Sequence, residues 1–220
     1  MKNNKNKTRI SIEGFQTEQE KFWAGKFGDE YITRNQEKTY LANNIVLLGK
    51  IIARTNRVDS VIEFGANIGI NLLAIKQLIP EVELSAIEIN EKAIDELNKL
   101  EQIKVYHQSA LEFIPDYRRD FVLSKGFLIH VNPDKLSKAY DLLYKTSCRY
   151  ICLAEYYSPT PVEVNYRGYQ DKLFKRDFAG EMLERFNNLQ LVDYGFIYHR
   201  DNQFPQDDIN WFLLEKTDRT

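Results

Sequence analysis

The stretch VDSVIEFGANIGINLLAIKQLIPEVELSAIEIN, residues 58–90, decides the fold of this 220-residue chain. It opens with a short apolar run, which the turn from Gly65 to Gly69 ends sharply. Apolar residues then recur at helical spacing until Pro80, which stops the helix. A second apolar run ends in the carboxylate of Glu88. Strand, glycine turn, helix, strand and terminal acid form the layout of a nucleotide-binding half of a doubly wound α/β fold.

Two carboxylates indicate which nucleotide this layout binds. Glu63 lies two residues before Gly65, where its side chain would face the turn. A dinucleotide brings a doubly negative pyrophosphate there, and a like charge about 4 to 6 Å away would be unfavourable by several kcal/mol at an effective dielectric of roughly 20. S-adenosylmethionine brings an ammonium and a sulfonium instead. Glu88 is placed to accept hydrogen bonds from both ribose hydroxyls, so the pair favours S-adenosylmethionine.

The stretch resembles motif I of the class I S-adenosylmethionine-dependent methyltransferases, although Asn67 replaces a glycine that is common in that motif. Asn tolerates the positive φ that such a turn requires. The resemblance implies a Rossmann-like doubly wound seven-stranded sheet, with a C-terminal antiparallel hairpin and an N-terminal helical lid. It implies S-adenosyl-L-methionine as cofactor, S-adenosyl-L-homocysteine as product and no metal. The residues expected at the cofactor from this stretch are Glu63, Gly65, Ala66, Asn67, Gly69, Glu88 and Ile89.

Composition excludes several other classes of protein. The chain has 30 Lys and Arg against 32 Asp and Glu, which does not favour a general nucleic-acid binder. Cys148 and Cys152 share parity on an apolar run and are expected to be inert core thiols. No apolar run is long enough for a membrane span, and no signal-peptide core follows Met1. A cytoplasmic protein without nucleic-acid or membrane partners is therefore expected.

Residues 1–16 are predicted to be a flexible tail, and residues 17–220 a single methyltransferase domain. Thr17 and Glu20 have the spacing of a capping box that starts a helix. The aromatic residues that follow could pack this helix down, or they could form a lid that excludes water from the cofactor. In the lid interpretation Tyr31 and Arg34 reach the methionine end of the cofactor, and Arg34 holds its carboxylate.

The remaining segments follow from periodicity and turn signals. Helices are expected at residues 39–54, 91–100, 133–146 and 176–186, further strands at 103–107, 120–123 and 149–154, and a final antiparallel pair at 189–200 and 210–215. The domain is accordingly divided into N-terminal helices or lid (17–57), cofactor-binding core (58–155), substrate-recognition segment (156–176) and C-terminal helix with hairpin (177–220).

Later loops are candidates for cofactor and acceptor contacts. By resemblance to methyltransferases of this fold, Ser109 and Ala110 contact the adenine and Lys125 borders the cofactor. The chain lacks the Asn/Asp-Pro-Pro-aromatic tetrapeptide of amino-methylating DNA enzymes. Two histidines, His130 and His199, could act as base towards a hydroxyl acceptor, although a histidine between apolar neighbours can also be structural. An amine acceptor could react without a base.

The segment after residue 155 mixes Tyr with Arg and Lys, which suits a sugar carrying a carboxylate or phosphate because Arg binds anions bidentately and Tyr stacks on ring faces. A solvated basic loop is the alternative. The residues expected at the acceptor are Tyr156, Tyr157, Tyr166, Arg167, Arg176 and Arg200.

Longer motifs resemble those of the pseudaminic acid biosynthesis-associated methylases. They are Phe22-Trp23, Phe27 to Tyr31, Arg34-Asn35, Val61 to Gly69, Ser124 to Gly126, Leu128 to His130, Tyr166 to Gly168, Leu173 to Met182 and the tail from Asp193 to Asp208. The resemblance implies an acidic amino sugar, or its nucleotide-activated form, as acceptor. A methyltransferase of another small molecule, a non-catalytic S-adenosylmethionine-binding module and a nicotinamide-dependent oxidoreductase remain as alternatives.

Overall fold

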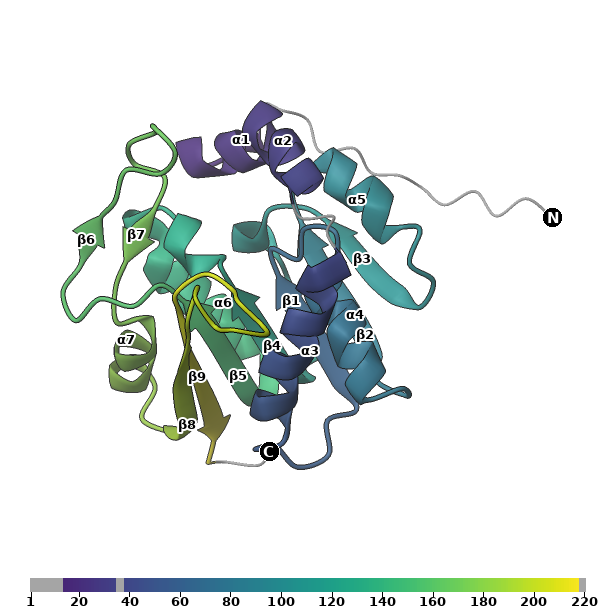
Figure 1. Ribbon diagram of the computed structural model, residues 1–220. Coiled ribbons are helices and arrows are strands. Elements are labelled where there is room, and N and C mark those ends of the chain that lie inside the picture. The colour runs from purple at the N-terminus through teal and green to yellow at the C-terminus, as the bar shows by residue number, and fades with distance from the viewer. Residues whose placement is uncertain (1–13, 35–37, 218–220) are drawn as a thin grey trace.

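The computed structural model describes residues 14–34 and 38–217. Its centre is a seven-stranded sheet of order β3-β2-β1-β4-β5-β9-β8 (Figure 1). Five strands run parallel, and β9 pairs antiparallel with both β5 and β8. The predicted doubly wound sheet with a C-terminal antiparallel hairpin is confirmed. The strands are β1 (Ser60–Phe64), β2 (Glu83–Glu88), β3 (Ile103–His107), β4 (Arg119–Lys125), β5 (Ser147–Glu155), β8 (Leu189–Ile197) and β9 (Ile209–Lys216).

Helices cover both faces of the sheet because successive residues of a buried strand point to opposite faces and are apolar on both. On one face Val61 of β1 packs in a core with α3 (Lys38–Ile52), α4 (Ile70–Leu78) and α5 (Glu91–Leu97). On the other face its neighbour Ile62 packs with α6 (Leu136–Thr146) and α7 (Phe178–Arg185). The parallel strands therefore end at one common edge between two helical layers.

The glycine turn after β1 needs its glycines for two reasons. Gly65 and Gly69 have φ angles of 70° and 81°, which L side chains rarely adopt. A Cβ on Gly65 would lie 2.9 Å from Cδ2 of Phe127, and one on Gly69 would lie 2.7 Å from Cδ2 of Leu97. Gly69 thus makes room for the end of α5, a contact that the sequence did not indicate. Asn67 has the expected positive φ, 48°.

Two N-terminal helices, α1 (Glu18–Ala24) and α2 (Lys26–Arg34), lie across the edge where the parallel strands end (Figure 1). The predicted capping box is confirmed. The amide of Glu20 donates to Oγ1 of Thr17 at 3.1 Å, and the amide of Thr17 donates to Oε2 of Glu20 at 2.9 Å. Most of the predicted tail, residues 1–13, lies outside the described residues.

The predicted substrate-recognition segment, residues 156–176, contains a small hairpin of β6 (Val162–Glu163) and β7 (Phe174–Lys175). The helix expected from residue 176 begins at Phe178 because the carboxylate of Asp177 accepts from the amide of Gly180 at 2.8 Å. Short 3₁₀ turns within the described residues include η2 (Ala110–Glu112), η3 (Leu128–His130) and η4 (Pro133–Lys135), and η4 forms the start of the helix predicted at 133–146.

The long connection between β8 and β9 is fixed to α3. The side-chain amide of Asn43 donates to the carbonyl of Pro205 at 2.6 Å, and the side chain of Gln206 donates to the carbonyl of Asn43 at 3.0 Å. This brings residues 199–207 to the edge where the parallel strands end. Within residues 14–34 and 38–217, no helix has the length and apolar character needed to cross a membrane.

Candidate functional site

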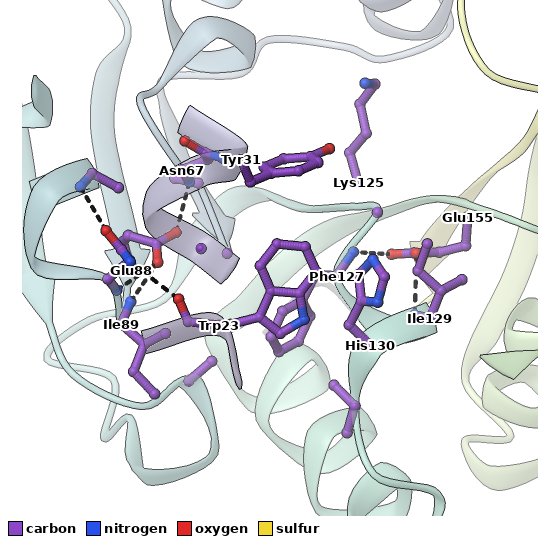
Figure 2. A pocket seen from close by; sticks show the side chains of 18 of the residues that line it. Trp23, Tyr31, Asn67, Glu88, Ile89, Lys125, Phe127, Ile129, His130 and Glu155 are labelled. Carbon is purple, nitrogen blue, oxygen red and sulfur yellow. Dashed lines mark hydrogen bonds between the residues drawn. The ribbon is translucent and has the colours of Figure 1, made fainter. Parts of the chain in front are cut away.

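A cavity of about 590 Å³ opens at the carboxyl ends of the parallel strands (Figure 2). Its walls come from α1 and α2, from the turns after β1, β2, β3, β4 and β5, and from two later segments around residues 166–167 and 199–207. Ligands of open α/β sheets bind at this edge. Segments that lie far apart in the sequence therefore meet around one space.

Glu88 forms one end of the cavity. Its carboxylate accepts from the backbone amides of Asn67 and Ile89, both at 2.7 Å, and of Asn90 at 2.8 Å. Burial raises the pKa of Glu88, and these amides oppose the shift by stabilising the charged form. A carboxylate has about four acceptor positions, so three amides leave it able to accept from a ligand. The Glu88 carboxylate thus binds the backbone of the glycine turn, through the amide of Asn67, at the cavity wall (Figure 2).

Two side-chain oxygens near the glycine turn have no hydrogen-bond partner among the described residues. These are Oδ1 of Asn67 and Oδ1 of Asn71, both on residues that line the cavity. A buried acceptor left without a donor costs about 1 to 3 kcal/mol. A bound molecule with N–H or O–H donors would remove that cost. The residues present therefore fit a ligand that carries both an amine and hydroxyl groups.

Glu63 is fully buried and does not line the cavity. Its Oε1 accepts from the side-chain amide of Asn71 at 2.6 Å, and its Oε2 has no partner among the described residues. Burial raises the pKa of Glu63 to about 8. A mostly protonated acid behind Asn71 would not repel a pyrophosphate, so the charge argument drawn from the sequence does not hold in that form. Asn71, which the sequence reasoning missed, is the residue that reaches the cavity.

Ser109 lies at the turn after β3 and is joined to the N-terminal helices. Its hydroxyl donates to Oε1 of Glu20 and accepts from the amide of Leu111 at 3.1 Å. Ser109 and Ala110 both line the cavity near this contact. The capping-box glutamate of α1 therefore also connects the N-terminal helices to the core.

Glu155 organises the opposite end of the cavity. Its Oε1 accepts from the hydroxyl of Ser124 at 2.6 Å and from the amides of Leu128 and Phe127 at 3.1 and 3.2 Å. Burial raises the pKa of Glu155 to about 7, against these hydrogen bonds. Because the amides belong to η3 and the residue before it, Glu155 fixes the turn that carries His130 (Figure 2).

The N-terminal helices contact the β6–β7 hairpin segment above the cavity. Gln19 donates to the carbonyl of Asp171 at 2.8 Å and accepts from the side chain of Asn132 at 3.1 Å. The ring of Phe22 lies 4.9 Å from that of Tyr169. We call α1, α2 and residues 164–172 the cap.

Fourteen of the predicted site residues line the cavity: Tyr31, Gly65, Ala66, Asn67, Glu88, Ile89, Ser109, Ala110, Lys125, His130, Tyr156, Tyr166, Arg167 and His199. Five do not: Glu63, Gly69, Tyr157, Arg176 and Arg200. Arg176 instead pairs with Glu181 at 2.7 Å, and Arg200 is exposed between β8 and β9. The side chain of Arg34 lies outside the described residues.

Three lining residues carry chemistry that the sequence reasoning left unassigned: Asn71, Glu155 and Asp207. Glu155 ends an apolar run just as Glu88 does, so the same signal could have identified it. Asn71 is a polar residue in the first turn after the glycines, which was a weaker signal. Asp207, which hydrogen-bonds with Tyr156, has no local signal because its position depends on how the β8–β9 connection folds back.

Candidate metal ligands do not gather at the cavity among the residues that the structure describes, and neither cysteine lines it. No group of three or more His, Cys, Asp or Glu residues there could hold a metal ion. Cys152 is buried in the sheet core, while Cys148 is half-buried and donates to Oδ1 of Asp120 at 3.3 Å. Burial raises the pKa of both thiols, as expected for unreactive core cysteines.

The chain is similar in structure to several solved methyltransferases. Burkholderia thailandensis 1,6-didemethyltoxoflavin-N1-methyltransferase, with 1,6-didemethyltoxoflavin and S-adenosylhomocysteine bound, has a TM-score of 0.64 and 14% identity, over 87% of this chain and 84% of that one. The plantazolicin methyltransferase BpumL in complex with S-adenosylhomocysteine gives 0.65 and 13%, over 91% and 94%. Magnesium protoporphyrin IX methyltransferase from Synechocystis, also with S-adenosylhomocysteine, gives 0.65 and 12%, over 89% and 96%.

Sequence comparisons add nothing to this likeness, because no family model and no curated protein matches the chain. Identities of 12 to 14% support a statement about fold only. The chain has the class I methyltransferase fold, with its cavity at the carboxyl ends of the parallel strands.

Proposed function

We propose that this protein is an S-adenosylmethionine-dependent methyltransferase that acts on a small polar metabolite. One observation carries the proposal. In a class I methyltransferase fold, the Glu88 carboxylate and the unpartnered oxygens of Asn67 and Asn71 converge on one cavity around the glycine turn. These groups match a ligand with ribose hydroxyls and an ammonium.

The residues that would hold the cofactor occupy two walls. Glu88 would accept from the ribose hydroxyls, and Ser109 with Ala110 would border the adenine. Asn71, which donates to Glu63, would accept from the ammonium, and Tyr31 and Lys125 would border the methionine part. The cofactor, once bound, supplies a methyl group on a positively charged sulfur.

The rest of the chain positions the acceptor and excludes water. The cap covers the cavity with the rings of Trp23 and Tyr166, which lie 6.3 Å apart. When two reactants are held in line under such a cover, their reaction becomes effectively unimolecular and water is excluded from it. Positioning is therefore the main contribution of this site.

For the acceptor we infer an acidic amino sugar or its nucleotide-activated form, of the kind found in nonulosonic (pseudaminic) acid pathways. Arg167 supports an anionic group, while Tyr156 and Tyr166 offer ring faces and hydroxyls. The motifs around these residues resemble those of the pseudaminic acid-associated methylases. Arg176 and Arg200 have no part in this inference because they lie away from the cavity.

Isothermal titration with S-adenosylhomocysteine and with NAD tests the cofactor. We expect S-adenosylhomocysteine to bind with a Kd in roughly the micromolar range, about −8 kcal/mol, and NAD not to bind. Glu83→Gln, an exposed change at the start of β2, serves as control and should bind like the unmodified protein. Binding of NAD alone would replace the proposal with an oxidoreductase.

Labelled methyl transfer tests the acceptor. A cytidine-monophosphate-activated nonulosonic acid should accept the methyl group in preference to the same sugar with its carboxylate converted to the neutral amide, because only the carboxylate can pair with Arg167 as an anion. Equal turnover of the two sugars would remove the acidic sugar from the proposal and leave the methyltransferase.

A further inference from the structure

His130 is held in one defined state by the cap. Its Nδ1 lies 2.6 Å from the carbonyl oxygen of Lys172. A carbonyl oxygen only accepts, so Nδ1 carries the hydrogen and donates it. Burial lowers the pKa of His130 to about 4, so the ring is neutral at neutral pH. A neutral imidazole has one N–H, and Nε2 therefore presents a bare lone pair.

The ring of Trp23 packs against that of His130 and carries an unsatisfied donor. Its Nε1 is buried and has no hydrogen-bond partner among the described residues. Indole nitrogen can only donate. The centroids of the Trp23 and His130 rings lie 4.5 Å apart, and both residues line the cavity (Figure 2). An unsatisfied donor and the ring that carries an unshared lone pair thus belong to two side chains in contact on one wall of the cavity.

The surroundings of this pair separate it from the cofactor end. Tyr166 adds a third ring, 5.0 Å from that of His130. The carboxylate of Glu155, the charged group next to this turn, is occupied by amides of η3 and by Ser124. The position is therefore aromatic and covered by the cap, and the carboxylate of Glu155 is turned to the protein.

We infer that the methylated atom is a hydroxyl oxygen, held between Nε1–H of Trp23 and Nε2 of His130, and that His130 takes its proton. This inference rests on the proposed function, since it presumes a methyl donor at the Glu88 end of the same cavity. It assigns O-methylation, Trp23 as a positioning residue and His130 as the base.

Counting lone pairs distinguishes the candidate acceptors. A hydroxyl oxygen can accept from Trp23, donate to His130 and keep a second lone pair for attack. An amine nitrogen has a single lone pair, which the Trp23 contact would occupy. An ammonium has none, and a carboxylate has no proton to give and would face the lone pair of Nε2. Among these groups the hydroxyl alone satisfies both residues and remains a nucleophile.

The reaction step balances on these groups. A lone pair of the hydroxyl oxygen forms the bond to the methyl carbon, and the carbon–sulfur bond breaks with its electron pair left on sulfur. The hydroxyl proton passes to Nε2 of His130, which becomes an imidazolium. Because that imidazolium is a strong acid in its buried site, it returns the proton to water when the product leaves.

His199, the other candidate base, has different surroundings. Its Nδ1 lies 2.9 Å from both carboxylate oxygens of Asp208, and its side chain is 49% exposed. Water can therefore take a proton from a hydroxyl near His199. The covered position of His130 suits a step from which water is excluded.

Imidazole nitrogen spectra test the state of His130 without any acceptor. The chain has three histidines, so the signals of His130 are identified as those missing in His130→Asn. With S-adenosylhomocysteine bound, we expect a protonated Nδ1, an unprotonated Nε2 and no titration between about pH 8 and pH 5. A hydrogen on Nε2, or titration near pH 6.5, would overturn the inference. A protein that fails to bind S-adenosylhomocysteine would instead overturn the proposed function.

Matched variants separate the base from its structural contact. The Asn amide of His130→Asn can still donate to the Lys172 carbonyl but lacks an acceptor at the position of Nε2. Transfer of ¹³C-labelled methyl is followed with nucleotide-activated sugars that carry hydroxyls and with amino sugars. We expect O-methyl products, a fall in kcat of about 100-fold for His130→Asn, and an unchanged Kd for S-adenosylhomocysteine. Trp23→Phe, which removes the N–H together with part of the ring system but keeps an aromatic side chain, should raise KM about tenfold with a smaller change in kcat.

N-methyl products, or an unchanged kcat in His130→Asn, would contradict the inference. If none of these sugars is methylated, the sugar acceptor of the proposed function fails. The imidazole spectra then decide the inference by themselves, since they depend on no acceptor.

Discussion

The two ends of the cavity are built in different ways. The glycine turn and Glu88, which form the centre of the Glu88 end, come from one continuous part of the chain, and backbone amides of Asn67, Ile89 and Asn90 fix the Glu88 carboxylate in place. The end around Trp23 and His130 is assembled from α1, η3 and residues 164–172, which meet through side chains such as Gln19. The first end exists once the sheet has formed, whereas the second exists only when the cap is docked.

Because of this difference, we expect the two ends to control different binding properties. Changes at the Glu88 end should alter cofactor affinity, and changes in the cap should alter acceptor affinity and local opening. Buried carboxylates at both ends add a dependence of stability on pH.

The largest effect concerns Glu63, whose pKa burial raises from its ordinary 4.5 to about 8. The groups facing it are Asn71, which opposes the shift, then Lys125 and Glu88, with Cys152 on the neighbouring strand. A raised carboxyl pKa contributes stability below pH 4.5 that is lost as pH rises towards 8. At pH 8 the free energy of unfolding of Glu63→Gln should therefore be larger than that of the unmodified protein, by on the order of 3 kcal/mol. Near pH 4 the two free energies should be equal.

Urea denaturation at several pH values checks this prediction. Glu96→Gln, a change of a partly exposed residue on α5 that pairs with Lys99, serves as control and should leave the pH profile unchanged. Parallel profiles for Glu63→Gln and the unmodified protein would show that Glu63 is ionised in the folded state.

Glu88→Gln should weaken binding of S-adenosylhomocysteine roughly 10- to 100-fold, or about 1.4 to 2.8 kcal/mol. The amide group of Gln has one oxygen, and its NH₂ would face a backbone N–H of Asn67, Ile89 or Asn90. Isothermal titration measures the change. An affinity equal to that of the unmodified protein would place the ribose elsewhere.

The same contrast explains what the sequence could predict. Gly65, Glu88 and the run between them are local signals, so the fold and the Glu88 end followed from one stretch of 33 residues, 58–90. Position at a strand end also brought Ser109 and Lys125 to the cavity wall. The sequence predicted Glu63 at the ligand. In the structure the side chain of Asn71 lies between Glu63 and the cavity, and residue spacing alone could not predict this.

The acceptor end was less predictable because it depends on contacts between distant segments. Arg176 was a reasonable candidate in a Tyr- and Arg-rich segment, yet its partner Glu181 turns it away from the cavity. Asp207 reaches the wall only because Asn43 fixes the β8–β9 connection to α3. Ring contacts such as Trp23 with His130 follow from cap docking, which no local pattern encodes.

Gln19→Ala should loosen the cap. The change removes hydrogen bonds to the Asp171 carbonyl and from Asn132, which together are worth about 1 to 2 kcal/mol. We expect faster amide hydrogen exchange in both α1 and residues 164–172, and a raised KM for the acceptor. Lys21→Ala, at an exposed position of the same helix, is the matched control. Faster exchange in α1 alone would show that the two parts of the cap open independently.

The smallest effect is expected for Thr17→Ala. Loss of this N-cap should destabilise α1 by about 1 kcal/mol. Exchange should rise in α1 with little change in the Kd for S-adenosylhomocysteine. A large loss of cofactor affinity would mean that α1 belongs to the Glu88 end as much as to the cap.

A crystal structure of the protein with S-adenosylhomocysteine tests the division of the cavity most directly. Our account predicts the ribose hydroxyls at Glu88, the amino group at Oδ1 of Asn71 and the sulfur directed towards Trp23 and His130. A nucleoside bound at the Trp23 end, with Glu88 untouched, would contradict it.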